Sequence, residues 1–252
     1  MSVVSGPPRA VYAAAAETLA GCVVHSLTGA DGAFRLSDQL APESRPVDRQ
    51  AGLAAVRVLG SDALAPFIAA GHQLSPEDAE VVGISIRTFP LPEPDLSAQP
   101  NDDADHAPLV RLLRQWATGE VLTRLGHPGL ASSYPSGVGA GFGRERGWLA
   151  WAEMLAQLSP VALPGLDSTL HADVRRYRLD VARGVTRSML RRDHLTAARL
   201  ARWLAVCGRA PMDPPFAVEL VVRELGLVAE PDPRLQLEIM MARHGLGGEF
   251  DD

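Results

Sequence analysis

The chain has 252 residues, of which 46% are hydrophobic and 21% charged, and its formal net charge is −6. This composition is typical of a globular protein with a hydrophobic core, and it excludes a disordered chain. All 24 basic residues are arginine. The lack of lysine excludes Schiff-base enzymes, pyridoxal-phosphate enzymes and Walker-type phosphate loops, which each need a lysine amine. We attribute the arginine bias to a GC-rich bacterial genome.

Residues 1–90 predict an acidic, helical N-terminal subdomain. An amphipathic helix is expected from Arg9 to about Ser26, and a second from about Val47 to Leu59, where Gly60 stops it. A third is expected between Ser61 and Gly71, although a proline at position 66 would disturb its first turns.

The clearest helix start in this half is Ser75-Pro76-Glu77-Asp78, which offers a cap, a proline in the first turn and two acids. Residues 79–89 fit a helix but are also rich in strand-forming side chains. We favour the helix because its start is well marked and no partner strand is evident.

Residues 91–108 are rich in proline and acid, and we predict an exposed linker that separates the first subdomain from a C-terminal domain over 109–252. Asp102, Asp103, Asp105 and His106 could be drawn as a metal site. In an acidic linker such a cluster indicates solvated charge, so neither a metal nor a cofactor is predicted.

A glycine-rich segment, residues 126–147, follows the helix predicted over 109–125. It has the glycine density of a phosphate-binding loop, but no strand precedes it and no lysine follows. We therefore interpret it as a flexible surface loop. Arg144 and Arg146 beside it are a secondary anion-binding candidate.

From Trp148 onward the helical pattern is strong. Helices are expected over residues 148–158, over a long stretch from 167 to a break at 191–193, over 193–208, over 216–225, and from 232 to 245. The fold class predicted for the whole chain is mainly α, a multi-helix bundle or stacked helical hairpins with little or no β-structure.

The helix pair over 167–208 contains the main candidate binding surface. Arg176, Arg183, Arg187 and Arg191 lie opposite the apolar face of the first helix, and Arg192 and His194 extend this positive surface around the junction. Asp173 and Asp180 stand at helical spacing from Arg176 and Arg183, which indicates local ion pairs on a solvated face. Four arginines against two aspartates still leave a positive excess, and guanidinium groups suit carboxylate or phosphate ligands.

Charge is also segregated along the chain. Residues 1–108 contain six arginines and 14 acids, residues 109–210 contain 15 arginines and seven acids, and residues 211–252 contain three arginines and nine acids. Such a chain pairs its own segments or presents a basic surface to an acidic partner.

We predict a cytoplasmic bacterial adaptor or assembly subunit that contacts an acidic protein partner through the arginine face. The alternative is a small helical enzyme, or a binder of an anionic small molecule, in secondary metabolism. His171 with Asp173 and Asp193 with His194 are neighbouring acid–histidine pairs, but no known catalytic motif occurs. Nucleic-acid binding through phosphates comes third, since Leu195–Leu204 resembles the first helix of a helix-turn-helix but the connection to residue 216 is too long. No apolar run approaches the length of a membrane span, so no membrane partner is expected.

Overall fold

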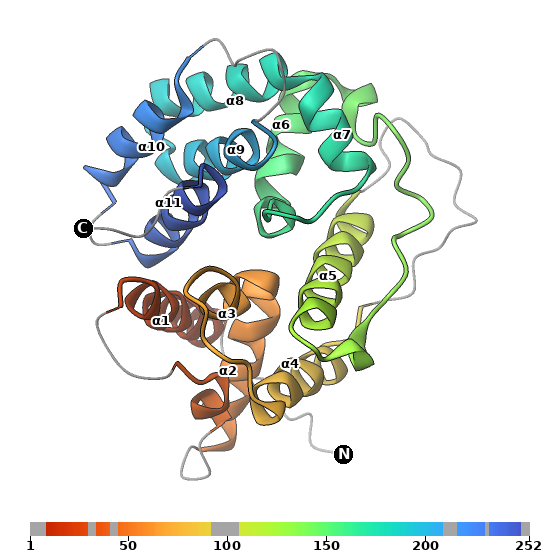
Figure 1. Cartoon of the computed structure of the whole chain (residues 1–252), viewed down its shortest axis with the longest axis vertical. Coiled ribbons are helices and arrows are strands. Elements are labelled where there is room, and N and C mark those ends of the chain that lie inside the picture. The colour runs from red at the N-terminus through yellow and green to blue at the C-terminus, as the bar shows by residue number, and fades with distance from the viewer. Residues whose placement is uncertain are drawn as a thin grey trace.

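The computed structural model describes residues 9–29, 34–40, 45–91, 106–208, 216–229 and 232–247. Within these ranges the chain forms helices joined by short turns and contains no strand, so the predicted mainly α, multi-helix fold is confirmed (Figure 1). The helices are α1 (Arg9–Leu27), α2 (Pro46–Leu59), α3 (Ala65–Ala69), α4 (Pro76–Thr88), α5 (Ala107–Arg124), α6 (Trp148–Gln157), α7 (Thr169–Arg176), α8 (Arg178–Leu190), α9 (His194–Val206), α10 (Val218–Gly226) and α11 (Pro233–Gly245). Short 3-10 turns, η1 (Leu36–Leu40), η2 (Gly60–Leu64), η3 (Pro128–Leu130), η4 (Arg144–Arg146) and η5 (Ser159–Val161), lie between them.

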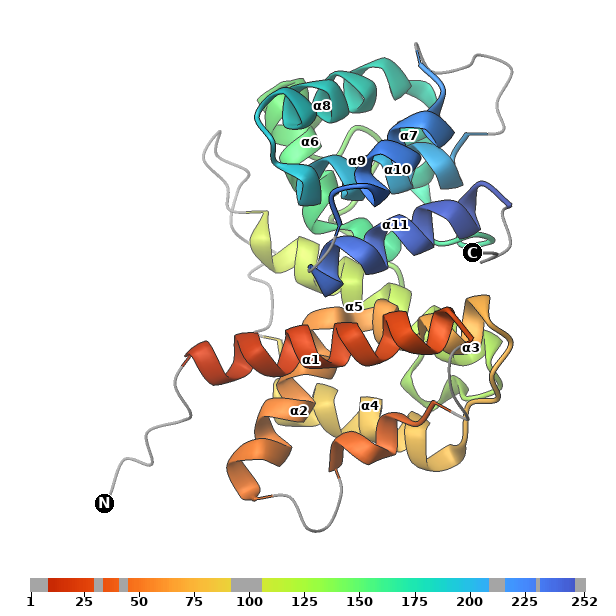
Figure 2. The same cartoon turned by 90° about the vertical axis from the view of Figure 1, so that its left-hand side faces the viewer.

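The helices form two tiers. Figures 1 and 2 show α1 to α4 in one tier and α6 to α10 in the other, with α11 lying against α1 where the tiers meet. At the side, α5 packs on η2 of the first tier and on η5 of the second. Helix α5 thus contacts both tiers, and it helps to hold them together.

Helix α1 illustrates how sequence spacing produces this packing. Ala16, Leu19, Ala20 and Val23 recur at helical spacing and are buried. Their face contacts α2 on one side and α11 on the other. Small alanine side chains allow these helices to approach closely, and the apolar surface removed from water stabilises the contact.

Helix α9 is the centre of the second tier. It contacts α6, α8, α10 and α11, and its side chains are buried on nearly all sides. Trp203 is fully buried, and its indole N–H donates to the carbonyl of Leu155 on α6 at 2.8 Å. This bond satisfies the polar atom that a buried indole carries.

The predicted helix starts are confirmed where a capping side chain carried the prediction. Ser75 accepts a hydrogen bond from the backbone N–H of Asp78 at 3.1 Å, and Asp193 accepts one from Thr196 at 3.1 Å. Asp232 accepts from Arg234 at 3.0 Å in the same way. The ambiguous residues 79–89 are helical as far as Thr88.

Two predicted helices differ from the structure. Between Ser61 and Gly71 the chain forms η2 and the short α3, with Pro66 in the first turn of α3. The Ser61 side chain does not cap η2 or α3. Its hydroxyl donates a hydrogen bond to the carbonyl of Pro160 at 2.6 Å. The buried hydroxyl therefore joins the tiers.

The long helix predicted from residue 167 is wrong, because it breaks at Tyr177 into α7 and α8. Tyr177 has φ −115° and ψ 34°. Its ring packs under the guanidinium of Arg144, with Cζ 3.5 Å from the ring centroid, and edge-on against Trp151. These tertiary contacts hold the break at a residue where the apolar periodicity continues without interruption.

Two segments, Ala10–Leu27 and Pro46–Ala69, have the length and mean hydropathy (1.3 and 1.4) to cross a membrane. The expectation that no apolar run approaches that length is therefore wrong. Buried core helices of soluble proteins pass the same test, and 72% of the second segment is buried within the fold against 33% of the first. Length and composition alone do not distinguish a membrane-spanning helix from a core helix of a soluble protein.

The buried apolar side chains on both sides of the predicted linker form one continuous hydrophobic cluster. Leu59 and Leu64 from the first tier and Leu113 and Leu155 from the rest of the chain are all part of it. The linker cluster of Asp102, Asp103 and Asp105 lies outside the described residues. The domain boundary at 91–108 stays a prediction. The described segments on its two sides share one hydrophobic core.

Candidate functional site

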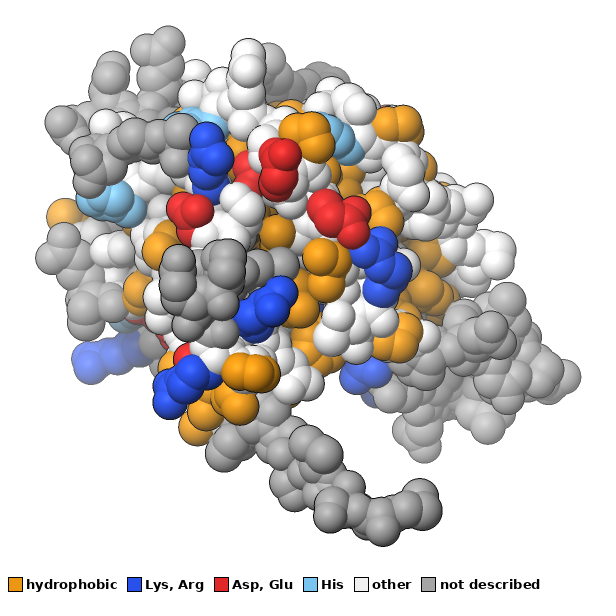
Figure 3. All heavy atoms as spheres, turned by 90° about the horizontal axis from the view of Figure 1, so that it is seen from below, with side chains coloured by type: hydrophobic (Ala, Val, Ile, Leu, Met, Phe, Trp, Pro, Cys, Tyr) orange, Lys and Arg blue, Asp and Glu red, His pale blue; other side chains and the backbone are white. Residues whose placement is uncertain are grey.

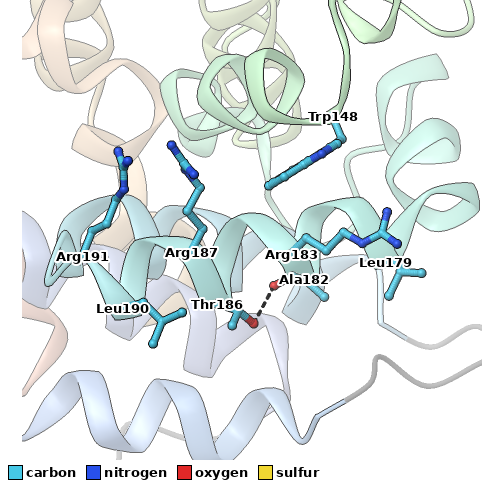
Figure 4. Close-up of a pocket in the computed structure, with 8 residues that line it drawn as sticks. All are labelled: Trp148, Leu179, Ala182, Arg183, Thr186, Arg187, Leu190 and Arg191. Carbon is cyan, nitrogen blue, oxygen red and sulfur yellow. Dashed lines mark hydrogen bonds between the residues drawn. The ribbon is translucent and has the colours of Figure 1, made fainter.

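The arginine face predicted from the sequence lies on α8, where it lines an open groove of about 470 Å³ (Figure 4). Trp148, the first residue of α6, stands over one side of the groove. The remaining lining residues all come from α8 and the residue after it: Leu179, Ala182, Arg183, Thr186, Arg187, Leu190 and Arg191.

The α8 groove exposes apolar side chains that a helix surface normally keeps covered. Leu190 is 82% exposed and Leu179 is 51% exposed, and the two stand three turns apart on the same face. With Ala182 and Trp148 they give the groove an apolar floor. Leu179 and Leu190 are thus the apolar side chains of this groove that a partner could cover.

The rim of the α8 groove is positively charged, and none of its lining residues is acidic. Arg183 pairs with Asp180 at 3.0 Å, as predicted. In the part of the chain that the structure describes, Arg187 and Arg191 form no ion pair. The predicted positive excess on this face is therefore concentrated in these two side chains.

The surface of the α1–α4 tier differs, because the ion pairs between its exposed described residues are local. Arg45 pairs with Asp48 at 2.8 Å and Arg87 with Glu80 at 2.5 Å. Figure 3, which views the molecule from below this tier, shows basic and acidic side chains interspersed among apolar ones. Among the described side chains of that face, neither sign of charge is gathered into one patch.

The other predicted surface residues do not join the groove lining. Arg176 ends α7, with Cζ 5.3 Å from the Tyr177 ring. Arg192 is exposed in the turn before α9 with φ 57°, the left-handed region, and His194 begins α9 half-buried. Asp173 was the expected partner of Arg176 but does not pair with it. Asp173 instead accepts a hydrogen bond from the backbone N–H of Gly141 at 2.6 Å.

The secondary candidates, Arg144 and Arg146, do not converge on an anion site. Arg144 pairs with Asp180 at 2.5 Å and stacks on Tyr177, so its charge is neutralised within the fold. Nη1 of Arg146 lies 3.5 Å from Nδ1 of His106 at the start of α5. The two guanidinium groups therefore serve to attach the glycine-rich segment to α8 and α5.

The glycine-rich segment lies at the surface over most of its length, as interpreted, but a few of its residues anchor it in the core. Val138 and Phe142 are buried in the core, and Gly141 bonds to Asp173 as described above. Gly143 has φ +80°, and a Cβ there would lie 2.7 Å from the thioether of Met154. The glycine is needed at this position for both conformation and space.

A second charged site, which we did not predict, is the fully buried guanidinium of Arg202 on α9. It donates to Asp62 at 2.7 Å, to Glu238 at 3.0 Å and to the carbonyl of Ala162 at 2.9 Å. Asp62 belongs to η2 of the first tier and Glu238 to α11. The network therefore connects three distant parts of the chain.

The two carboxylates of this buried network have opposite pKa shifts. Burial raises the pKa of Asp62, and the attraction of Arg202 offsets this only in part. Burial also acts to raise the pKa of Glu238, but Arg202 and Arg199 outweigh it and leave the pKa below its usual value. Glu238 also accepts hydrogen bonds from Ser159 at 2.7 Å and Arg199 at 3.2 Å, so it is the most fully satisfied of the group.

No catalytic arrangement is evident around the candidate acid–histidine pairs. Nδ1 of His171 lies 2.8 Å from the hydroxyl of Ser168, while its Nε2 is buried without a hydrogen-bond partner. Burial lowers the pKa of His171 to about 4 and raises that of Cys207 to about 12. Both shifts favour the uncharged forms, which are those expected of structural side chains.

Comparisons with family models, curated proteins and solved structures find no match to this chain. Across the described ranges, no group of three or more histidine, cysteine, aspartate or glutamate side chains is placed to hold a metal ion. The function must therefore be argued from the α8 groove and the charged groups around it.

Proposed function

We propose that this protein is an interaction module that docks an acidic, amphipathic helix of a partner protein in the α8 groove. The observation that carries the proposal is the combination, on one helix face, of exposed Leu179 and Leu190 with two arginines, Arg187 and Arg191, that form no ion pair among the described residues. A purely structural arginine face would lack the exposed leucines, and a purely apolar patch would lack the cations.

The dimensions of the groove favour a helical segment as its occupant. At a rise of 1.5 Å per residue, the face from Leu179 to Arg191 is about 18 Å long. A helix of about a dozen residues covers that length, and helix-in-groove recognition uses apolar anchors at three- and four-residue spacing.

Affinity and selectivity would come from different side chains. Covering a leucine side chain contributes about 1.5–3 kcal/mol, so Leu179, Leu190 and Trp148 would provide most of the affinity. Exposed arginine–carboxylate pairs contribute less, about 0–1 kcal/mol each. Their main effect is to favour acidic over basic partners and to speed association.

Localisation in the cytoplasm and a bacterial source remain part of this proposal. The free thiols of Cys22 and Cys207 support a reducing compartment.

The proposal is tested with synthetic fluorescein-labelled peptides of 14 residues and fluorescence anisotropy. The probe has leucines at helical spacing flanked by glutamates; one control has lysine in place of glutamate, and a second has the same composition scrambled to remove the apolar face. We expect saturable binding of the acidic amphipathic probe alone. Equal binding of the scrambled peptide would contradict docking in a groove.

Variants then locate the site. Arg187→Glu with Arg191→Glu should weaken binding of the acidic probe by about tenfold or more, because two attractive pairs become repulsive. Leu190→Ala should weaken it to a similar extent through lost apolar contact. The matched control is Arg223→Glu, a charge reversal of an exposed arginine on α10, whose side chain is 69% exposed. An equal loss of peptide binding in that control would show that the effect comes from the overall charge of the protein and not from the α8 groove.

A nucleic-acid partner is distinguished by the same variants. A random-sequence DNA duplex bound through phosphates should dissociate steeply as salt rises. The contrary outcome is tight, salt-sensitive binding of the duplex that depends on Arg187 and Arg191, while the acidic peptide does not bind. That result would identify nucleic acid, and not a protein, as the partner.

A further inference from the structure

A second cavity lies where α5 meets α6, α9 and α11, next to the buried network of Arg202. Its volume is about 240 Å³. Four arginines from three helices line it: Arg111 and Arg114 of α5, Arg199 of α9 and Arg234 of α11. The only acidic residue in the lining is Glu238. This cavity shares no lining residue with the α8 groove.

Glu238 cannot neutralise the cavity. One of its oxygens accepts from Ser159 and Arg199, and the other accepts from Arg202, which lies behind the cavity wall. Asp62 is committed to Arg202. Counting both carboxylates as ionised, the two acids face Arg202 and the four arginines of the lining, so a positive excess remains.

The positive excess is borne by side chains without an acidic partner. Arg114 donates to the backbone carbonyl of Val58. Neither Arg111 nor Arg234 takes part in an ion pair with any residue that the structure places. Burial, together with the proximity of Arg234 and Arg199, lowers the pKa of Arg114 to about 10, while Asp62 and Glu238 act in the opposite direction. Like charges are thus held close together on the wall of one small cavity.

Such an arrangement costs free energy unless an anion offsets it. Guanidinium groups bind phosphate and carboxylate oxygens through two parallel N–H donors, and several such groups around one point suit an anion with many oxygens. The volume corresponds to about eight water molecules at about 30 Å³ each. It is smaller than the usual site for a drug-sized ligand.

We propose that this cavity binds a small phosphate-bearing anion, of about the size of pyrophosphate, held by Arg111, Arg114, Arg199 and Arg234. Phosphate is preferred to a simple carboxylate because it offers three or more oxygens and up to two charges to guanidinium donors that approach from three helices. A ligand bound there would contact α5, α9 and α11 together, and it would tighten the junction of the two tiers.

The test uses the full chain and three defined probes at constant ionic strength: inorganic phosphate, pyrophosphate and succinate. Isothermal titration calorimetry measures affinity, and thermal unfolding measures the stabilisation that selective binding to the folded state produces. We expect pyrophosphate to bind most tightly and to raise the melting temperature most. Succinate binding as tight as that of pyrophosphate would overturn the assignment to phosphate, and no saturable binding of any probe would overturn the site.

Two variants and a matched control locate the binding. Arg234→Gln and Arg111→Gln should each weaken pyrophosphate binding by about tenfold, because each removes a charged hydrogen-bond donor. Arg243→Gln changes an exposed arginine of the same helix as Arg234 but outside the cavity lining, and it should leave binding unchanged. An equal loss in all three variants would show diffuse attraction to a basic surface and would overturn the proposal.

Arg234→Gln has a second readout that a merely structural arginine would not produce. Without added anion, the variant should melt at a higher temperature than the parent protein, because one of the crowded positive charges is removed. With pyrophosphate the order should reverse. A variant that melts at a lower temperature under both conditions would identify Arg234 as a structural residue and would overturn its role in binding.

Discussion

Arg202 on α9 and Arg187 on α8 carry the same guanidinium group in different surroundings, one in the core and one on a groove at the surface. Arg202 is fully buried, and its donors reach two carboxylates and a carbonyl from three separate elements. Arg187 lies on the rim of an open groove, where it forms no ion pair with any residue that the structure describes. The first guanidinium is part of the folded core, whereas the second is half-buried at the surface of the protein.

The difference teaches that charge by itself does not indicate the role of an arginine in this protein. A buried ion network contributes mainly through the penalty for breaking it, since the groups left behind have lost their water. An exposed arginine contributes little to the free energy of folding and can be used for recognition. Substitutions can test this division between arginines that stabilise the fold and arginines that are free for recognition.

The largest effect is expected for Arg202→Met. The change leaves Asp62 and Glu238 buried without their shared cation, and it should lower the free energy of unfolding by about 3–5 kcal/mol. Urea denaturation at neutral pH measures this value. Arg187→Met is the control on α8, and similar losses in both variants would break the comparison.

The next effect concerns His171, which is buried with Nε2 unpaired and has its pKa lowered to about 4. Burial is the main cause; Asp167 opposes it, and Arg175 and Arg124 add to it. Between pH 6.5 and 4 the unfolded chain binds a proton here that the folded chain does not, so stability falls as the pH falls. The loss should reach about 3 kcal/mol at and below pH 4, because one pKa unit corresponds to about 1.4 kcal/mol.

The measurement for His171 is urea denaturation at pH 7 and at pH 4.5 for the parent protein and for His171→Gln. The glutamine variant should lose less stability on acidification than the parent. An identical pH dependence in the two proteins would show that another group is responsible.

A smaller effect is expected at Gly184, where α8 packs closely on its neighbours. A Cβ there would lie 2.9 Å from Ala152 of α6 and 2.9 Å from Leu200 of α9. Gly184→Ala should therefore destabilise by about 1 kcal/mol, the cost of overpacking less the gain in helix propensity. The matched control is Gly21→Ala in α1, where the nearest atom is 3.9 Å away. That variant should be as stable as the parent or more stable by thermal unfolding.

The smallest effect is expected for Arg187→Gln with Arg191→Gln. Both side chains lack ion pairs within the described chain, so the free energy of unfolding should change by less than about 0.5 kcal/mol. Denaturation in urea, run beside the peptide-binding assay, checks this. A loss of several kcal/mol would mean that these arginines support the fold, and the division between the two regions would fail.

Much of the fold could be predicted because its helix starts have local signals. Ser75, Asp193 and Asp232 each cap a helix by accepting a hydrogen bond from a backbone N–H two or three residues later, so the evidence lies in a short stretch of sequence. The break at Tyr177 could not be predicted, because apolar spacing continues across it and its contacts are with Arg144 and Trp151, which lie far earlier in the sequence.

The candidate sites show the same limit. Arg183, Arg187 and Arg191 were predicted to share a face because they belong to one helix, and the structure places all three along one groove. Arg202 and the four arginines of the second cavity escaped prediction because each group is assembled from separate helices. Asp62 stands 140 residues from Arg202 in the chain, and no local pattern connects them.

The distance between Asp62, Arg202 and Glu238 also has a consequence for the order in which the protein can fold during synthesis. Asp62 leaves the ribosome 140 residues before Arg202, and Arg202 leaves it 36 residues before Glu238. Until α11 has emerged, the first tier lacks the helix that packs on α1, and Arg202 has only one of its two carboxylates. The first tier therefore exposes apolar surface until α11 has been synthesised, and the final packing of the two tiers follows the synthesis of that helix.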